Sequence, residues 1–550
     1  MSVNMLRGAD IVARTLVSLG VKKIFTLSGN HIMPLFDALI STDIELVHVR
    51  HEAACVHMAD AWGRLTGEVG VALVTGGQGH SNAAAALFTA LSAESPMVLL
   101  SGHASLKELG LGAFQELAQA DIAKPMTKAS WTSSAKATLA EDLVRGFNIA
   151  KQGRPGPVHI SLPVDLLEEK TNGNELNPTT RDSTAKRRLD PSQLENVRRL
   201  IAKAARPLIL CGPAMCSAEG RKRMRALEAA SSIPVIGMES PRGVKDPSLG
   251  CFAEALAEAD LLVLVGKQLD FTLKFGDAPA VASNCSFVVI DPDSAMVSRV
   301  ERTKGDRLLM FALADPAPTL EDFVVRLQGL GSSAWLDRVR KALAFSPPVW
   351  SSAAGTEGRL HPLQLCRIVG EFVERHVGST LVCDGGEIGQ WPQAIIKTER
   401  RLINGVSGTI GASIPFAIAA KAIRPDAPAV AILGDGTFGF HMAEFDTALR
   451  HGLPIIAVVG NDSRWNAEYQ IQLRSFGSER ARYCDLLPTR YDQVVAALGG
   501  FGALATTANE LRSALRLAHA SGKPACINVM IESISAPDIR SSDGEGPAAC

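Results

Sequence analysis

Short apolar runs that end in glycine or a polar residue alternate along the chain with segments of helical spacing. Arg7–Leu19 is typical of the latter, because its apolar residues recur at the intervals of a helix with one buried face. Strands that alternate with helices in this way favour a parallel, doubly wound sheet. In the first third of the chain the pattern predicts strands over Val21–Leu27, Glu45–Val49, Val69–Val74, Met97–Leu100 and Val158–Leu162.

The same alternation begins again after each of two predicted linkers. Lys170–Asp190 is polar and contains Asn, Thr, Pro and Lys, and Gly329–Arg359 is rich in Ser, Ala and Pro. Beyond these linkers, strands are predicted over Pro207–Leu210, Leu261–Val265, Phe287–Ile290, Thr380–Cys383, Pro428–Leu433, Ile455–Val459 and Cys526–Met530.

The pattern therefore predicts an α/β protein with three doubly wound parallel-sheet domains, over residues 1–168, 191–330 and 361–532. A chain of 550 residues is too long for one hydrophobic core, which agrees with several domains. The first and third domains have similar lengths and strand order. They are interpreted as copies of one cofactor-binding unit, each holding one end of a ligand. Residues 533–550 are expected to form a mobile tail.

Composition excludes several classes of partner. The net charge is −1 and aromatic residues make up 5%, so neither a basic surface nor stacking platforms for nucleic acid are expected. No apolar run reaches the roughly 20 residues needed to span a bilayer, and no signal segment is evident. The 10 cysteines form no CxxC pair, which is typical of reduced thiols in a cytoplasmic protein.

The stretch Leu433–Asn466 carries the strongest chemical signal. An apolar run breaks at Gly434-Asp435-Gly436, and a second apolar run ends at Gly460-Asn461-Asp462. Ligands bind outside the carboxyl ends of strands in open α/β sheets, where Asp435 and Asp462 can converge on one ion. Carboxylates and the amides of a helix start suit a hard cation and an anion. A magnesium–diphosphate site is predicted; the alternative is an ordinary turn followed by a helix cap.

A second candidate is Glu52, which follows a predicted strand and opens a helix whose apolar face should be buried. A carboxylate at that position is expected to be poorly solvated. The alternative is an acidic residue that is favoured by the positive end of the helix dipole and has no chemical role.

Three segments together resemble the thiamine-diphosphate-dependent enzymes of the acetolactate synthase and pyruvate decarboxylase superfamily. They are GDGTFGFHMAEFDTALRHGLP with the GND that follows it, RHEAACVHMADAWGR and LVTGGQGHSNAAAAL. The resemblance covers nearly the whole chain. It implies a pyrimidine-binding, a central and a diphosphate-binding domain, and the cofactors thiamine diphosphate and Mg²⁺. A homodimer is then the smallest active unit, and a homotetramer is expected.

The resemblance also assigns roles to residues. Glu52 would protonate N1′ of the aminopyrimidine, facing the cofactor held by another subunit. Asp435 and Asp462 would bind magnesium through their side chains, and Arg464 through its backbone carbonyl. Relatives usually carry Asn where this chain has Asp462, which leaves metal affinity and preference open. Further contacts to the cofactor are expected from Thr75, Asp384, Gly385, Gly386, Gly434, Gly436 and Thr437.

The segment Gly405–Gly411 resembles the part of these enzymes that bends the cofactor. Ile410 would be the apolar wedge beneath the two rings, and the carbonyl of Gly408 would face the 4′-amino group. Without the resemblance, Ile410 is better interpreted as an ordinary core residue.

The segments that bear on the reaction point to more than one subfamily. His31 and Gln115 stand where benzaldehyde lyase has polar active-site groups, whereas GAFQE (112–116) and LDFTLKFG (269–276) resemble 2-hydroxyacyl-CoA lyases and oxalyl-CoA decarboxylases. Acetolactate synthase shares a GAFQE-like segment. The favoured reaction is reversible cleavage of a 2-hydroxyacyl-CoA to an aldehyde or ketone and formyl-CoA. The alternatives are an acyloin lyase, an acetolactate synthase acting on a 2-oxo acid, and a non-catalytic relative.

Several further polar residues have a structural and a functional interpretation. His31 can act as an acid or base and Gln115 as a donor to a developing alkoxide, or both can be structural. His80, His103 and His441 are further candidates to line the cleft, and Trp465, Asn466 and Glu468 to close over the substrate.

The central domain lacks a clean GxGxxG motif. Gly212, Gly266 and Asp291 at its strand ends are compatible with bound FAD, with bound ADP, or with an empty domain. The basic run Arg221–Arg225 is interpreted as a solvated helix face, with contact to a CoA phosphate as the alternative.

Overall fold

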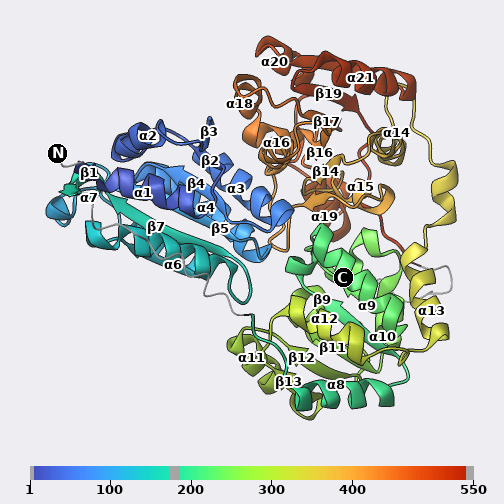
Figure 1. Ribbon diagram of the computed structural model, residues 1–550. Helices are drawn as coiled ribbons and strands as arrows, with labels where there is room; N and C mark the ends of the chain where they lie inside the picture. Colours follow the sequence, from blue (N-terminus) through green and yellow to red (C-terminus); the bar gives the residue numbers. More distant parts are fainter. Residues whose placement is uncertain (1–4, 173–185, 541–550) are drawn as a thin grey trace.

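The computed structural model describes residues 5–172 and 186–540. Three large parallel sheets with helices on their faces form an α/β protein, which confirms the predicted fold class (Figure 1). A small antiparallel pair, β1 (Met5–Arg7) with β8 (Lys170–Asn172), joins the two ends of the first domain. Each of the three predicted ranges contains one large sheet; the boundaries themselves stay a prediction. Most of the first predicted linker lies outside the described residues.

The first sheet has the strand order β3-β2-β4-β5-β7-β6. The predicted strand from Met97 is longer than expected, because residues 101–103 continue the pairing with β7. The strands are β2 (Lys23–Thr26), β3 (Glu45–His48), β4 (Gly70–Val74), β5 (Met97–His103), β6 (Ala129–Thr132) and β7 (Pro157–Pro163). The helices are α1 (Gly8–Ser18), α2 (Met33–Leu39), α3 (Glu52–Thr66), α4 (Gln78–Ser92), α5 (Gln119–Ala123), α6 (Leu139–Lys151) and α7 (Val164–Glu168).

The central sheet has the order β10-β9-β11-β12-β13. Its strands are β9 (Pro207–Cys211), β10 (Val235–Gly237), β11 (Leu261–Val265), β12 (Ser286–Ile290) and β13 (Leu308–Ala312). Its helices are α8 (Pro191–Lys203), α9 (Ala218–Ser231), α10 (Phe252–Glu258), α11 (Ser294–Lys304), α12 (Pro316–Arg326) and α13 (Ser333–Ala344).

The third sheet, with the order β15-β14-β16-β17-β19-β18, repeats the topology of the first. This repetition supports the interpretation of two copies of one unit. The strands are β14 (Thr380–Cys383), β15 (Arg401–Ile403), β16 (Ala429–Gly434), β17 (Ile456–Asn461), β18 (Phe501–Ala505) and β19 (Ala525–Met530). The helices are α14 (Pro362–Arg375), α15 (Gln390–Ile395), α16 (Ser413–Ile423), α17 (Asp435–His441), α18 (Glu444–Arg450), α19 (Asn466–Phe476), α20 (Tyr491–Ala497) and α21 (Ala508–Ser521).

The first and third domains of the chain share one hydrophobic core. Met58 on α3 and Phe416 on α16 belong to the same buried cluster, together with Phe25 of the first sheet and Leu433 of the third. The alanine-rich faces of α3 and α16 allow the two helices to approach closely. The core therefore fixes how these two domains are oriented within one chain.

The tail was expected to be mobile, but the part of it that the structure describes, residues 533–540, makes specific contacts. Ser533 Oγ donates to Asn466 Oδ1 at 3.1 Å, and Ile534 O accepts from Asn466 Nδ2 at 2.8 Å. The backbone N–H of Ala536 donates to the Glu387 carboxylate, and Ile539 packs against the third-domain and central-domain cores. Residues 533–540 are therefore held in place by polar and apolar contacts; residues 541–550 lie outside the described residues.

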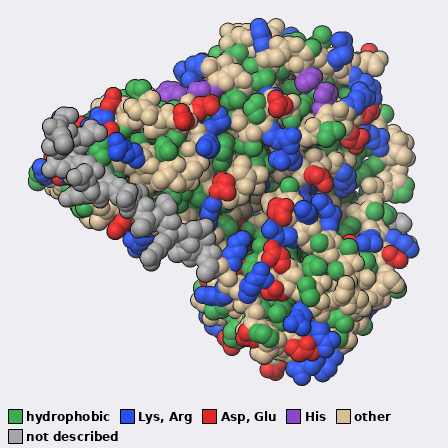
Figure 2. All heavy atoms as spheres, viewed as in Figure 1, with side chains coloured by type: hydrophobic (Ala, Val, Ile, Leu, Met, Phe, Trp, Pro, Cys, Tyr) green, Lys and Arg blue, Asp and Glu red, His purple; other side chains and the backbone are tan. Residues whose placement is uncertain are grey.

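The surface and the thiols agree with the composition. Figure 2 shows acidic and basic side chains interspersed over the visible face, with no large area of one sign. The cysteines among the described residues are free and buried. Within residues 5–172 and 186–540, no helix combines the length and the apolar character needed to cross a membrane.

Candidate cofactor site

A cavity of 310 Å³ opens at the carboxyl edge of the third sheet. It lies where strand order reverses between β14 and β16, the position at which open α/β sheets bind ligands. Residues 240–242 of the central domain contribute to its wall. Many predicted site residues meet here: Asp384, Gly385, Gly386, Gly408, Ile410, Gly434, Asp435, Gly436, Thr437, Asp462 and Arg464, together with Trp465, Asn466 and Glu468.

Two carboxylates, Asp435 and Asp462, face this cavity. Asp435 accepts hydrogen bonds from the backbone N–H of Gly436 at 2.9 Å and of Arg464 at 3.2 Å. Burial raises the pKa of Asp435 to about 6. Burial, and then the nearby charge of Asp435, raise the pKa of Asp462 to about 7. A bound divalent cation would favour the ionised form of both groups, so this donor set fits a hard metal ion.

Arg464 can contribute only its backbone to such an ion. Its guanidinium forms an ion pair with Asp485 at 2.8 Å and lies over the ring of Tyr469, 4.0 Å from the ring centroid. Among the described residues no cluster of three or more His, Cys, Asp or Glu side chains could hold a metal. A cation at this edge would therefore need backbone and ligand oxygens in addition to Asp435 and Asp462.

The start of α17 is shaped for close approach by an anion. Gly434 precedes the helix in an extended conformation, and Thr437 Oγ1 donates to the Gly434 carbonyl at 3.0 Å. A Cβ on Gly436 would lie 2.8 Å from the Trp465 ring, so a larger residue would displace that ring. The free amides of a helix start favour phosphate oxygens at this point.

The segment that precedes α16 is anchored by Asp384. One oxygen of this buried carboxylate accepts from the backbone N–H of Gly385 and of Gly411, at 2.6 and 2.9 Å, and the other accepts from Ser413 Oγ at 2.5 Å. Asp384 is thus engaged within the protein. Its contact with a cofactor stays a prediction.

Ile410 is half-buried and lines the cavity, which does not match the interpretation as an ordinary core residue. Gly408 and Gly411 on either side have φ angles of 70° and 84° and allow the chain to turn there. A Cβ on Gly385 would lie 2.6 Å from Ile410 Cγ2, so glycine is needed beneath the isoleucine.

The remaining predicted residues, His31, Glu52, Thr75 and Gln115, lie together at the first sheet. With Asn82, which the sequence did not single out, they form the first-sheet cluster. His31 Nδ1 lies 3.2 Å from Thr75 Oγ1, across the point where strand order reverses between β2 and β4. Asn82 Nδ2 donates to Glu52 Oε2 at 3.0 Å. Gln115 has a φ of 56° and packs closely over Gly77.

The first-sheet cluster does not line the 310 Å³ cavity. Glu52 is half-buried at the first position of α3, after His51 as the cap. His31 is buried and stacks on Phe114, which is 67% exposed, and burial lowers the pKa of His31. The cluster and the cavity therefore lie apart within one chain.

Three histidines that were candidates to line the cleft lie elsewhere, and several polar residues around the cavity were not predicted from the sequence. His80, His103 and His441 are buried and lie within hydrogen-bond distance of other protein groups, and none lines the cavity. Sequence reasoning missed a set of polar residues around the cavity. It comprises Arg242, Glu387, Gln390, Trp391 and Gln393, of which Trp391 Nε1 and Gln393 Oε1 are buried without a partner among the described residues.

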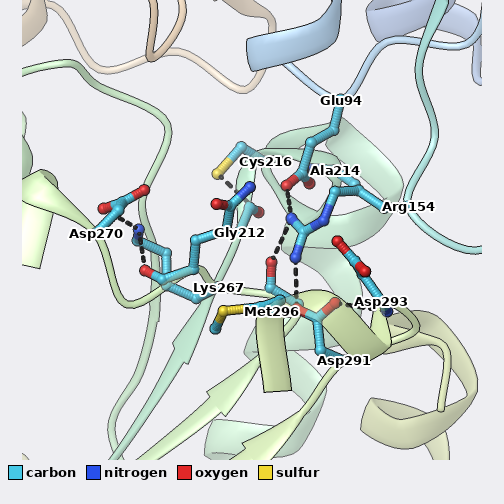
Figure 3. A network of polar contacts seen from close by, with 12 residues as sticks. Glu94, Arg154, Gly212, Ala214, Cys216, Lys267, Asp270, Asp291, Asp293 and Met296 are labelled. Atoms are coloured by element: carbon cyan, nitrogen blue, oxygen red, sulfur yellow. Dashed lines mark hydrogen bonds and ion pairs between the residues drawn. The ribbon is translucent and has the colours of Figure 1, made fainter. Parts of the chain in front are cut away.

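Protein groups fill part of the carboxyl edge of the central sheet, and a cavity of 140 Å³ lies beside the turn that follows β9. The reversal of strand order there falls between β9 and β11, and a Cβ on Gly212 would lie 2.2 Å from the Gly266 carbonyl oxygen. Arg154 of the first domain enters this edge and pairs with both Glu94 and Asp291, as Figure 3 shows, and donates to the Gly266 carbonyl at 3.0 Å. Asp291, one of the strand-end residues considered for a nucleotide, is fully buried in that ion pair. Arg154 therefore occupies the end of the strand that carries Asp291, one of the positions considered for a nucleotide.

The chain belongs to the thiamine pyrophosphate enzymes. Its residues 6–122 match the N-terminal TPP binding domain of that family, residues 194–321 the central domain, and residues 384–529 the C-terminal TPP binding domain. The protein is thus a thiamine-diphosphate-dependent enzyme with the predicted set of domains.

Relatives with two different names resemble the whole chain. It is 30% identical to 2-hydroxyacyl-CoA lyase 2 of Homo sapiens, over 95% of this chain and 90% of that protein. The protein of the same name in Danio rerio is also 30% identical, over 95% and 91%. Acetolactate synthase large subunit IlvG of Mycobacterium tuberculosis is 28% identical, over 95% of each chain.

Proposed function

We propose that this enzyme reversibly cleaves a 2-hydroxyacyl-CoA to an aldehyde or ketone and formyl-CoA, with thiamine diphosphate and Mg²⁺. The observation that carries the proposal is the similarity, over 95% of the chain, to proteins named 2-hydroxyacyl-CoA lyase 2. Acetolactate synthase is the second candidate, because a relative of that name matches at nearly the same identity. Acyloin cleavage of the benzaldehyde-lyase type is a close chemical variant.

The cavity supplies the diphosphate half of the site. Asp435, Asp462 and the Arg464 carbonyl would hold Mg²⁺, and the first amides of α17 would bind the diphosphate. Gly408 and Ile410 would position the aminopyrimidine and keep the cofactor bent. Thiamine diphosphate, when bound, supplies the nucleophilic carbon for cleaving a bond next to a carbonyl.

The first-sheet cluster supplies the proton-handling half. Glu52 would hold a proton at N1′ of the aminopyrimidine, and the Asn82 amide at 3.0 Å orients that carboxylate. Burial lowers the pKa of His31, so its neutral imidazole would accept a proton from the substrate oxygen. Gln115 would donate a hydrogen bond to the same oxygen.

A second copy of the chain would complete the site. The shared core fixes the first and third domains of one chain, and in that arrangement Glu52 lies outside the cavity. We therefore propose that Glu52 of one copy acts on the cofactor held by the cavity of another. The smallest active unit is then a homodimer, and two dimers would form a tetramer. For the central domain, the ion pairs of Arg154 with Glu94 and Asp291 support a purely structural role without FAD or ADP.

Two incubations distinguish the candidate reactions. With formyl-CoA and an aldehyde, the proposed enzyme should form a 2-hydroxyacyl-CoA that is detected by mass spectrometry. With pyruvate it should release little carbon dioxide. Rapid carbon dioxide release from pyruvate without a product from formyl-CoA would favour acetolactate synthase and refute the proposal. Condensation of two aldehydes without use of formyl-CoA would favour the acyloin lyase.

A further inference from the structure

A carboxylate of the third domain holds the segment that leads into Glu52. Glu444 opens α18 and is 1% exposed. The backbone N–H of Arg50 donates to its two oxygens at 3.1 and 3.2 Å, and the backbone N–H of His51 also bonds to this carboxylate. Thr447 Oγ1 donates to Oε2 at 2.6 Å. These donors fix Glu444 against the two residues that immediately precede Glu52.

Neighbouring contacts dock the same segment on α18 and the residue after it. The backbone N–H of His48 donates to His451 Nε2 at 3.0 Å, and Arg450 Nη2 donates to the His48 carbonyl at 2.6 Å. The Arg50 guanidinium also faces Asp446 at 3.6 Å. Unlike these groups, Glu444 binds the backbone amides that immediately precede α3.

The direction of the Glu52 side chain depends on this backbone. Its carboxylate accepts a hydrogen bond from the Asn82 side chain, and the residue is half-buried. Because one side-chain contact leaves the carboxylate some freedom, its position follows from the orientation of the first turn of α3. In a site that transfers a proton, a misplacement of about 1 Å can lower the rate by about 100-fold.

We propose that Glu444 is a positioning residue for Glu52 and acts through the backbone N–H groups of Arg50 and His51. The inference rests on the role of Glu52 in the proposed function. It also connects two sites, because α17 begins with Asp435 and α18 begins with Glu444. One continuous segment thus carries a metal ligand of its own cavity and holds the Glu52 that serves the cavity of the second copy.

The contact itself is tested in the full-length protein without cofactor. Glu444→Gln keeps the shape but replaces one acceptor oxygen by an NH₂ group, which cannot accept from a backbone N–H. Amide hydrogen exchange at Arg50 and His51, measured by mass spectrometry, should become about tenfold faster through the loss of one hydrogen bond. Asp446→Asn on the same helix is the control, because Asp446 pairs with side chains, and it should leave the rate at these two amides unchanged.

The positioning role is tested with thiamine diphosphate and Mg²⁺ bound and no substrate present. Exchange of the C2 proton of the cofactor, followed by NMR, should be about 10- to 100-fold slower in Glu444→Gln than in the wild type. The dissociation constant for thiamine diphosphate should stay unchanged, since the cavity residues are intact. A wild-type C2 exchange rate in a folded Glu444→Gln protein would overturn the proposal, even if its amide exchange were faster.

Two comparisons keep the result unambiguous. If Glu444→Gln does not fold, Glu444→Asp retains both oxygens but withdraws them by one methylene, and the same two measurements apply to it. Glu52→Gln separates this inference from the proposed function. If Glu52→Gln slows C2 exchange and the Glu444 variants do not, Glu444 has no positioning role while Glu52 keeps its own. If neither change slows C2 exchange, the assigned role of Glu52 fails as well.

Discussion

Replacing Asp462 by asparagine should remove a pH-dependent loss of folding stability from the metal-free protein. Burial and the neighbouring Asp435 raise the pKa of Asp462 from its ordinary 3.8 to about 7. The folded protein therefore retains a proton that the unfolded chain releases between these values, so stability falls as pH rises through this window. Above pH 7 the cost is about 4 kcal/mol, and between the two pKa values it grows by about 1.4 kcal/mol per pH unit.

The assay is denaturant unfolding of wild type and Asp462→Asn in a metal chelator, at several pH values from 5 to 8. The advantage of Asp462→Asn should grow from pH 5 to about pH 7 and then level off, and saturating Mg²⁺ should abolish the growth because a bound cation favours the ionised carboxylate. Asp485→Asn is a matched control on the same side of the site, because the Asp485 side chain is 71% exposed. It should show no such growth.

The pH dependence, rather than the absolute difference, decides the outcome. The amide group introduced by Asp462→Asn adds a contribution that does not titrate, so it shifts the whole curve without changing its slope. A difference between wild type and Asp462→Asn that stays constant from pH 5 to pH 7 would refute the reasoning. So would a metal-free wild type that gains stability over Asp462→Asn as pH rises.

Two further substitutions and one extraction test other parts of the protein. Glu52→Gln should leave the unfolding transition intact and lower the turnover number by about 100-fold or more, whereas full activity would remove Glu52 from the mechanism. Gly436→Ala should destabilise the protein by about 1–3 kcal/mol and weaken Mg²⁺ binding, since its Cβ would meet the Trp465 ring at 2.8 Å; unchanged unfolding and Mg²⁺ titration would contradict the close packing. Acid extraction of the purified protein should release neither FAD nor ADP, whereas a stoichiometric nucleotide would mean that Arg154 moves out of the central edge.

The sheet interiors could be predicted from the sequence, and most sheet edges could not. The inner strands are buried on both faces, so they form continuous apolar runs such as those of β16 and β17. Five edge strands had no such signal: β6, β10, β13, β15 and β18. They are short or half-exposed, as in the alternately exposed Leu308–Ala312, and edge strands gain less from apolar side chains.

In the candidate site, too, some residues could be predicted from the sequence and others could not. Asp435 and Asp462 were accessible to sequence reasoning because a local motif places each at the end of a strand. The role of Asp384 as an anchor was not, since it depends on contacts to Gly411 and Ser413 that only folding creates. The contact of Glu444 with Arg50 joins residues 394 positions apart, and no periodicity could reveal it.

The most direct test of the proposed function is cleavage of a 2-hydroxyacyl-CoA by the purified protein with thiamine diphosphate and Mg²⁺. Formation of formyl-CoA and the matching aldehyde or ketone in equal amounts, dependent on added thiamine diphosphate, is the predicted result. Decarboxylation of pyruvate to acetolactate by the same preparation, with the 2-hydroxyacyl-CoA left intact, would contradict it.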